Sequence, residues 1–138
     1  MKNTLEAGLT YEFEYLVPEN RTVPHLLPEA EEFAVMPQVL ATGYMVGLIE
    51  WTCIQAVNPH LDWPTEQTVG IGIEVSHLSP TPPRLTVKVA VELTKVEGRK
   101  LTFAVRADDG HDKITEGTHQ RFVVDPKSLT AKARAKLG

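Results

Sequence analysis

Residues 42–58 read Thr-Gly-Tyr-Met-Val-Gly-Leu-Ile-Glu-Trp-Thr-Cys-Ile-Gln-Ala-Val-Asn, and this stretch decides the fold. It predicts one helix that is apolar on almost every side, which is typical of a helix buried by the rest of its domain. Thr42 is expected to cap the helix, and Asn58-Pro59 to end it. On a helical wheel, Glu50 falls in the middle of the apolar stripe. Because an unpaired buried carboxylate is costly, Glu50 is expected to be paired or to take part in chemistry.

The bulk composition limits the classes of protein that this chain can belong to. Its 138 residues predict a single domain, residues 1–138, that is long enough to bury a core. The net charge of −4 gives no reason to expect a nucleic acid or a membrane surface as partner. One cysteine excludes an internal disulfide framework, and no apolar run approaches the length that spans a bilayer. We therefore expect a protein of the reducing cytoplasm.

Alternating apolar and polar residues predict strands on both sides of the helix. The first lies before the helix and four more follow it, at residues 9–17, 69–77, 85–93, 101–107 and 114–124. Short turns between the later segments indicate antiparallel pairing, so the fold class is α+β, with one helix on a five-stranded sheet. A sheet wrapped around a central helix resembles the hotdog fold. Its unprotected edges predict a homodimer.

Two segments lie outside this pattern. Residues 18–41 contain four prolines and cannot form one regular element, and so long a connection is often a lid or binding loop. Its apolar members are expected either to cover the edge of the core or to line such a lid: Val23, Leu26, Phe33 and Met36. Residues 127–138 are basic and alanine-rich, which favours a solvated terminal helix over a phosphate-binding role.

The candidate catalytic residues are Glu50, His77 and Thr42. Two independent periodicities aim Glu50 and His77 at the interior, and a carboxylate with an imidazole is a common acid–base or nucleophile–base pair. Thr42 adds a hydroxyl beside the free N–H groups of a helix start, which suits a carbonyl oxygen or an anion. Each of the three also has a structural alternative. Glu50 could be a paired buried carboxylate, His77 a hydrogen-bonded histidine at a strand end, and Thr42 a simple helix cap.

Distance restricts how these residues combine. Thr42 and Glu50 are eight residues apart, which is about 12 Å along a helix. They can share a site only if the chain bends at Gly43 or if a second subunit supplies one of them, which again favours a dimer. No histidine pair has the spacing of a metal motif, and no glycine-rich loop precedes a helix to hold phosphate.

Several segments together resemble the fluoroacetyl-CoA thioesterase family of hotdog enzymes. They are residues 41–53, His77 with Thr81-Pro-Pro-x-Leu-Thr-Val87, Val96-Glu-Gly-Arg99 and Gly117-Thr-His-x-Arg121. The resemblance covers nearly the whole chain in one order and spacing. It implies Thr42, Glu50 and His77 as the catalytic set, with Gly70 and Arg121 in the substrate pocket and Val23, Leu26 and Phe33 in a hydrophobic lid. Met36 stands where the family has a gating phenylalanine, which leaves the acyl group open.

The expected function is hydrolysis of a short acyl-CoA thioester, with coenzyme A as part of the substrate and no further cofactor or metal. Glu50 would attack the carbonyl or activate water, and His77 would carry the proton. The alternative is a non-catalytic protein that binds or senses acyl-CoA on the same fold. A hydratase-type enzyme is disfavoured because the helix contains no aspartate.

Overall fold

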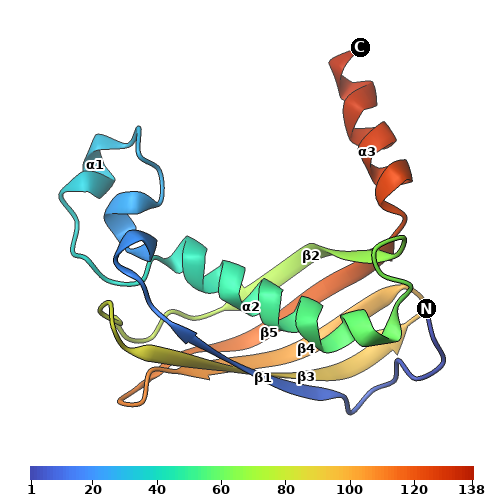
Figure 1. The fold of residues 1–138 in the computed structure, drawn as a ribbon, viewed down its shortest axis with the longest axis horizontal. Helices are drawn as coiled ribbons and strands as arrows, with labels where there is room; N and C mark the ends of the chain where they lie inside the picture. Colours follow the sequence, from blue (N-terminus) through green and yellow to red (C-terminus); the bar gives the residue numbers. More distant parts are fainter.

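The computed structural model describes residues 1–138 and contains five strands and one long helix. The elements follow one another as β1 (Thr10–Leu16), α1 (Glu31–Ala34), α2 (Thr42–Val57), β2 (Gln67–Val75), β3 (Thr86–Glu97), β4 (Lys100–Asp108), β5 (Lys113–Val124) and α3 (Pro126–Arg134) (Figure 1). No helix has the combination of length and apolar character that crossing a bilayer requires. The α+β class and the expected strand succession are confirmed.

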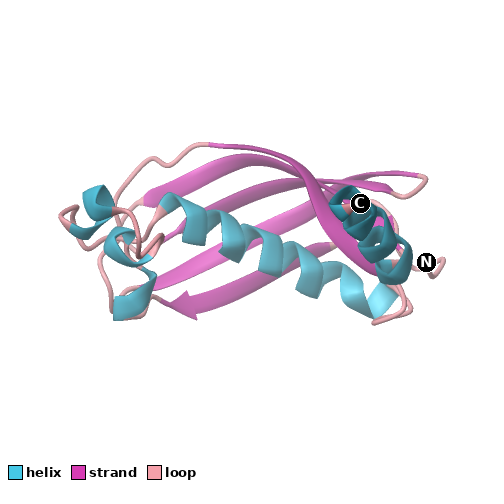
Figure 2. Cartoon of the chain, turned by 90° about the horizontal axis from the view of Figure 1, so that it is seen from above, coloured by secondary structure: helices cyan, strands magenta, loops and turns pink.

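The five strands form one antiparallel sheet in the order β1-β3-β4-β5-β2. β1 and β2 are therefore the two edges, although the chain places them on either side of α2. The helix runs along one face of the curved sheet, as the view from above shows (Figure 2). This arrangement is the predicted sheet wrapped around a central helix.

The core lies between α2 and the middle of the sheet. One side of the helix is buried, through Met45, Leu48, Ile49, Thr52, Cys53, Ala56 and Val57. It faces the alternate, inward side chains of β3 and β4, which are Val87, Val89, Val91, Leu93, Leu101, Phe103 and Val105. Each such side chain stabilises the fold by about 1.5–3 kcal/mol when fully buried. The helix ends where expected, because Pro59 cannot donate a helical hydrogen bond.

Two expectations about α2 are wrong. Ala41 occupies the cap position, and Thr42 is the first helical residue, with its side chain bonded elsewhere. Glu50 does not lie in the middle of the buried stripe: its side chain is 40% exposed. The reason is that α2 has two apolar faces. Only one of them packs on the sheet, and the face that carries Glu50 with Val46 and Ile54 is left partly uncovered.

Strand β2 also departs from the simple alternation. Its register shifts between Gly70 and Gly72, which places one extra residue in the strand. Gly70 pairs with Arg121 on the helix side of the sheet, whereas strict alternation from an inward His77 would put it on the outer side.

The edge position of β2 has a further effect. Ile71 and Ile73 are 50% and 40% exposed, because nothing in the chain covers this edge. His77 lies two residues beyond the end of β2 and is exposed, so its expected position as an inward strand residue is wrong.

The lid segment, residues 18–41, is built from two short 3-10 turns and the single turn of α1. A bridge between Thr22 and Leu40 closes its base, and the Tyr44 hydroxyl donates a hydrogen bond to the carbonyl oxygen of His25. The lid and α3 both extend beyond the β2 edge, at opposite ends of the molecule (Figure 1). Asp125 caps α3 by accepting a hydrogen bond from the Lys127 amide, and the expected terminal helix is present and exposed within the chain.

Candidate active site

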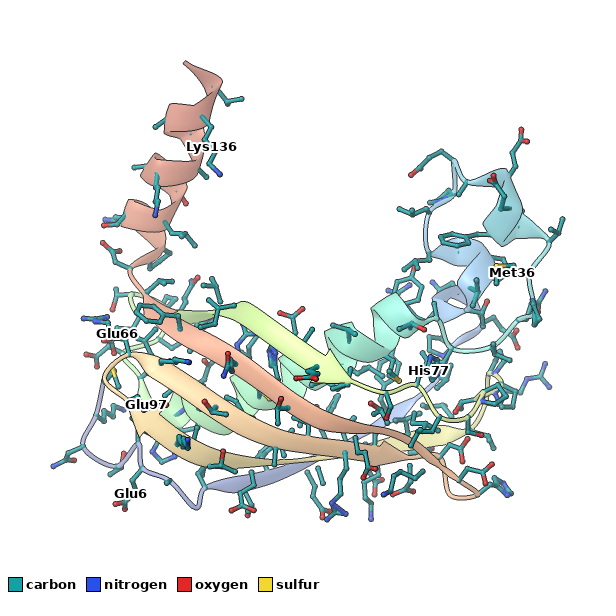
Figure 3. The ribbon with its side chains drawn as sticks, turned by 180° about the vertical axis from the view of Figure 1, so that it is seen from behind. Glu6, Met36, Glu66, His77, Glu97 and Lys136 are labelled. Atoms are coloured by element: carbon teal, nitrogen blue, oxygen red, sulfur yellow. The ribbon has the colours of Figure 1, made fainter.

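The first polar cluster joins the start of α2 to the segment after β2. A hydrogen bond of 2.7 Å connects Thr42 Oγ1 with His77 Nδ1. Both residues line an open cavity of about 300 Å³ at the base of the lid, with Val23, Val39, Leu40, Leu78, Ser79 and Pro80. Partial burial of the ring lowers the pKa of His77 from its usual 6.5, so the imidazole is neutral at neutral pH. Figure 3 shows His77 below the lid that carries Met36.

The second cluster holds Glu50 from the middle of α2. Arg121 Nη1 donates a hydrogen bond of 2.9 Å to Glu50 Oε2. The arginine side chain is only 3% exposed, and its Nε and Nη2 donate to the hydroxyl and carbonyl oxygens of Thr68, each at 2.8 Å. The guanidinium plane is thus fixed by β2, and it fixes one oxygen of the carboxylate.

Gly70 explains how the carboxylate can reach Arg121. A Cβ atom at this position would lie 2.8 Å from Glu50 Oε2, closer than real Cβ atoms approach an oxygen. The pairing of Gly70 with Arg121 therefore places a residue without a side chain beneath the carboxylate, just before the bulge. Any larger residue would push Glu50 away from its partner.

His119 completes this cluster in a defined tautomer. Its Nδ1 lies 2.8 Å from the carbonyl oxygen of Gly72, which can only accept, so Nδ1 carries the hydrogen. In the neutral ring Nε2 is then an acceptor, and Arg121 Nη1 lies 3.1 Å from it. Burial and the neighbouring arginine both lower the pKa of His119, so the neutral form is favoured. His119 therefore orients the same Nη1 group that holds Glu50.

Cys53 lies below this cluster and takes no part in it. Burial raises the pKa of its thiol to about 12, so the sulfur stays protonated and is a poor nucleophile. No group of three His, Cys, Asp or Glu side chains is arranged to hold a metal ion.

Within one chain the two clusters are separate. Thr42 and Glu50 stand on a continuous helix, eight residues or about 12 Å apart, so a bend at Gly43 does not bring them together. The expected pair of Glu50 with His77 is therefore not formed inside the chain: each residue has a different partner.

The predicted lid residues divide in the same way. Val23 lines the cavity of Thr42 and His77, and Leu26 packs against Gly43 at the start of α2. Phe33 is half-buried in α1, and Met36, which follows α1, is 44% exposed. The lid thus covers the end of α2 that carries Thr42.

Sequence reasoning missed two members of the second cluster, His119 and Thr68. His119 lies two residues before Arg121 on one strand, so alternation alone would have placed the two side chains on one face. Thr68 is the inward residue of β2 two positions before Gly70, where its hydroxyl and its carbonyl oxygen both meet the guanidinium. No pattern in the sequence marks this second contact.

Comparisons with known proteins agree with the geometry. The model of the fluoroacetyl-CoA-specific thioesterase family matches residues 20–127. The fluoroacetyl-CoA thioesterase of Streptantibioticus cattleyicolor is 47% identical over 136 residues, which cover 99% of this chain and 97% of that protein.

Solved structures give the same result. The fluoroacetyl-CoA thioesterase FlK superimposes with a TM-score of 0.93 at 47% identity, over 96% of this chain and 97% of that one. A hot-dog-like protein from Thermanaerovibrio acidaminovorans, only 20% identical, gives a TM-score of 0.78 over 96% of this chain and 93% of that one. The predicted hotdog fold is confirmed.

Proposed function

Because the chain belongs to the family of fluoroacetyl-CoA-specific thioesterases, we propose that it hydrolyses a short-chain acyl-CoA thioester to a free acid and coenzyme A. The observation that carries this proposal is the Glu50 carboxylate. Arg121 holds one of its oxygens, Gly70 leaves space beside it, and its side chain remains 40% exposed to an incoming substrate. A positioned carboxylate of this kind can attack a carbonyl carbon or activate a water molecule.

Two routes are open to Glu50. In the first, it removes a proton from water as the water oxygen attacks the thioester carbon, and the C–S bond breaks to release the CoA thiolate. In the second, it attacks the carbon itself, and water then opens the resulting anhydride. In both routes the thiolate finally takes up a proton. The scheme needs no metal or added cofactor, since coenzyme A arrives as part of the substrate.

His77 is suited to carry that proton. Its Nδ1 is engaged by Thr42, which leaves Nε2 free to face the reacting atoms. Because the pKa of His77 is lowered, the neutral ring can accept a proton and pass it to the sulfur. The backbone N–H groups at the start of α2, beside Thr42, are available to the developing oxyanion.

A homodimer would unite the two clusters. Thr42, Val46 and Glu50 are four residues apart on the partly uncovered flank of α2, beside the exposed edge of β2. A twofold axis that passes near Val46 would set Thr42 of one copy opposite Glu50 of the other, since two such helices run antiparallel. Pairing of β2 with its symmetry mate would cover Ile71 and Ile73 and close the exposed edge.

Met36 bears on the acyl group. Methionine is apolar but flexible, and it gives the lid no flat aromatic wall. We therefore place the substrate among short acyl-CoA esters without a strict fluoroacetyl preference. The single cysteine is free and buried, which fits the reducing cytoplasm that we propose as the location.

Thiol release from a panel of acetyl-, fluoroacetyl- and longer acyl-CoA esters tests the activity. Wild type should hydrolyse at least one short ester, and Glu50→Gln should lose about 10²–10⁴-fold in kcat, the range of acid–base catalysis. The matched control is Glu92→Gln, an exposed carboxylate of β3 away from both clusters and from the β2 edge. If the Glu50→Gln variant hydrolysed acyl-CoA esters at the wild-type rate, the proposal would be contradicted. In the same panel, Met36→Phe should narrow the preference toward the smallest esters.

Complementation tests the shared site. Glu50→Ala and His77→Ala chains should each be inactive, but a refolded equimolar mixture should regain about one quarter of wild-type activity, because half the dimers then hold one intact site. If each site used residues of one chain only, the mixture would stay inactive.

The second candidate is a non-catalytic acyl-CoA binder. The separation of Glu50 from His77 within one chain favours it if the protein is a monomer. Tight acyl-CoA binding by a monomer with no thiol release over hours would establish this function instead.

A further inference from the structure

The C-terminal helix α3 has no partner in its own chain. It is nine residues long, and every residue from Lys127 to Gly138 is exposed. A helix of this length is marginal by itself in water. Its apolar residues are exposed as well, since Leu129 is 40% and Leu137 is 91% accessible. This segment therefore has the properties of a helix that packs on another molecule.

The charges of α3 and of the lid are complementary. Residues 126–138 carry four basic side chains and no acidic one: Lys127, Lys132, Arg134 and Lys136. Residues 22–41 of the lid carry three acidic side chains and no lysine or arginine: Glu29, Glu31 and Glu32. All seven are exposed, and none forms an ion pair within the chain.

Within one chain, α3 and the lid are too far apart to touch. They can meet only when two copies of the chain associate. Both extend past the β2 edge, but the lid lies at one end of α2 and α3 at the other (Figures 1 and 3). A twofold axis near the middle of β2 exchanges the two ends. The α3 of one copy then lies on the same side and at the same end as the lid of the second copy.

We propose that α3 of each chain docks on the lid of a second copy of this chain, with its basic side chains beside Glu29, Glu31 and Glu32. Leu129 then packs against apolar lid residues that are now exposed, such as Leu27 and Val35. This inference rests on the homodimer of the proposed function. Its consequence is that the C-terminal helix of one subunit holds the cover of the site to which the other subunit contributes Thr42 and His77.

Zero-length crosslinking tests the contact directly. A dimer refolded from equal amounts of unlabelled and ¹⁵N-labelled full-length chains is treated with a carbodiimide, which joins lysines to carboxylates in contact. Peptides that contain Lys127 or Lys132 should be joined to peptides that contain Glu29, Glu31 or Glu32, with mixed isotopes in about half of the links. If Lys127 and Lys132 are joined only to carboxylates outside the lid, or to none, the proposal is overturned.

Charge reversal tests its effect on the lid. Lys132→Glu with Arg134→Glu should raise amide exchange in residues 23–36 about five- to tenfold, because attractive contacts become repulsive. Glu31→Lys with Glu32→Lys should do the same, and the four changes together should restore slow exchange. Lys95→Glu, on an exposed site of β3, is the charge control. Unchanged lid exchange in the reversed variants, or no restoration when they are combined, would contradict the contact.

Two outcomes separate this inference from the proposed function. An active dimer without crosslinks between α3 and the lid overturns the inference and leaves the thioesterase assignment intact. If instead the α3 reversal raises KM for acyl-CoA but not for the matching acyl-pantetheine, the basic residues hold the phosphates of coenzyme A and not the lid.

Discussion

The two polar clusters of this protein differ in how firmly the fold holds them. The cluster of Glu50 and Arg121 is anchored by β2 and β5 beneath the middle of α2, with the arginine almost fully buried. The cluster of Thr42 and His77 consists of one hydrogen bond between a helix start and a loop, at the base of the lid. The first is thus preorganised by the sheet, while the second can move with the lid.

This difference suggests a division of labour. A group that reacts with the carbonyl carbon needs fixed geometry, because a misplacement of about 1 Å can cost about 10²-fold in rate. A proton carrier near the entrance can tolerate more movement, since substrate entry and product release require the lid to open. Substitutions in the two clusters should therefore affect stability and turnover to different degrees.

The largest effect is expected at Arg121. Arg121→Met removes the donors to Glu50 and Thr68 and leaves a partly exposed carboxylate and the Thr68 carbonyl oxygen unpaired, so the free energy of unfolding should fall by about 2–3 kcal/mol. Urea denaturation measures this fall. Arg106→Met, on the exposed face of β4, should change stability by less than about 0.5 kcal/mol. If both variants lowered the free energy of unfolding equally, the hydrogen bonds of Arg121 would not be the cause of the loss.

The second-largest effect is expected at Gly70. The Cβ of Gly70→Ala must displace the carboxylate of Glu50, so kcat should drop about 10–100-fold while the dichroism spectrum stays native. Gly72→Ala is the matched control, because its Cβ would meet only the flexible end of Gln120, at 3.3 Å. If both variants lost activity equally, steric contact with Glu50 would not be the cause.

His119 should have a smaller effect, and one that depends on which nitrogen is replaced. His119→Gln can keep an acceptor near the Nε2 position, whereas His119→Asn can keep only the donor to Gly72. We expect kcat to fall about tenfold in the asparagine variant and less in the glutamine variant, with KM nearly unchanged in both. Equal decreases of kcat in the two variants, or a change in KM alone, would show that His119 contributes only through packing.

The smallest effect is the dependence of stability on pH. The pKa values of His77 and His119 are both lowered from 6.5 in the folded chain, mainly by burial. As the pH falls below about 6.5, the unfolded chain binds more protons than the folded one, so the free energy of unfolding decreases. Urea titrations across this range measure the slope, which should be shallower in His119→Gln. A wild-type slope of the opposite sign would contradict these shifts.

The fold could be predicted because strong local patterns agree with it. The alternating segments and the apolar stretch at residues 42–58 correspond to the strands and to α2 within a few residues at most boundaries. The helical wheel failed at Glu50 for a physical reason: it shows which faces are apolar, but not which of two apolar faces the chain itself will cover.

The site could be predicted only in part. The resemblance supplied Glu50, Gly70 and Arg121, and the structure places these three together. The contacts of Thr68 and His119 involve backbone carbonyl oxygens, which any residue type offers, so the sequence carries no mark of them. The position of His77 was missed because a bulge and an early strand end interrupt the alternation.

The extra residue in β2 leaves a signature that a mutational scan would detect. Before the bulge, Thr68 and Gly70 face the helix, so even-numbered positions should be intolerant of change. After it, Ile73 and Val75 pair with His119 and Gly117, so intolerance should move to odd-numbered positions. A tolerance profile along residues 67–75 should therefore reverse its phase at Ile71. Deleting that one residue should bring the two halves into phase, so that Gly70 and Ile73 become consecutive helix-facing positions.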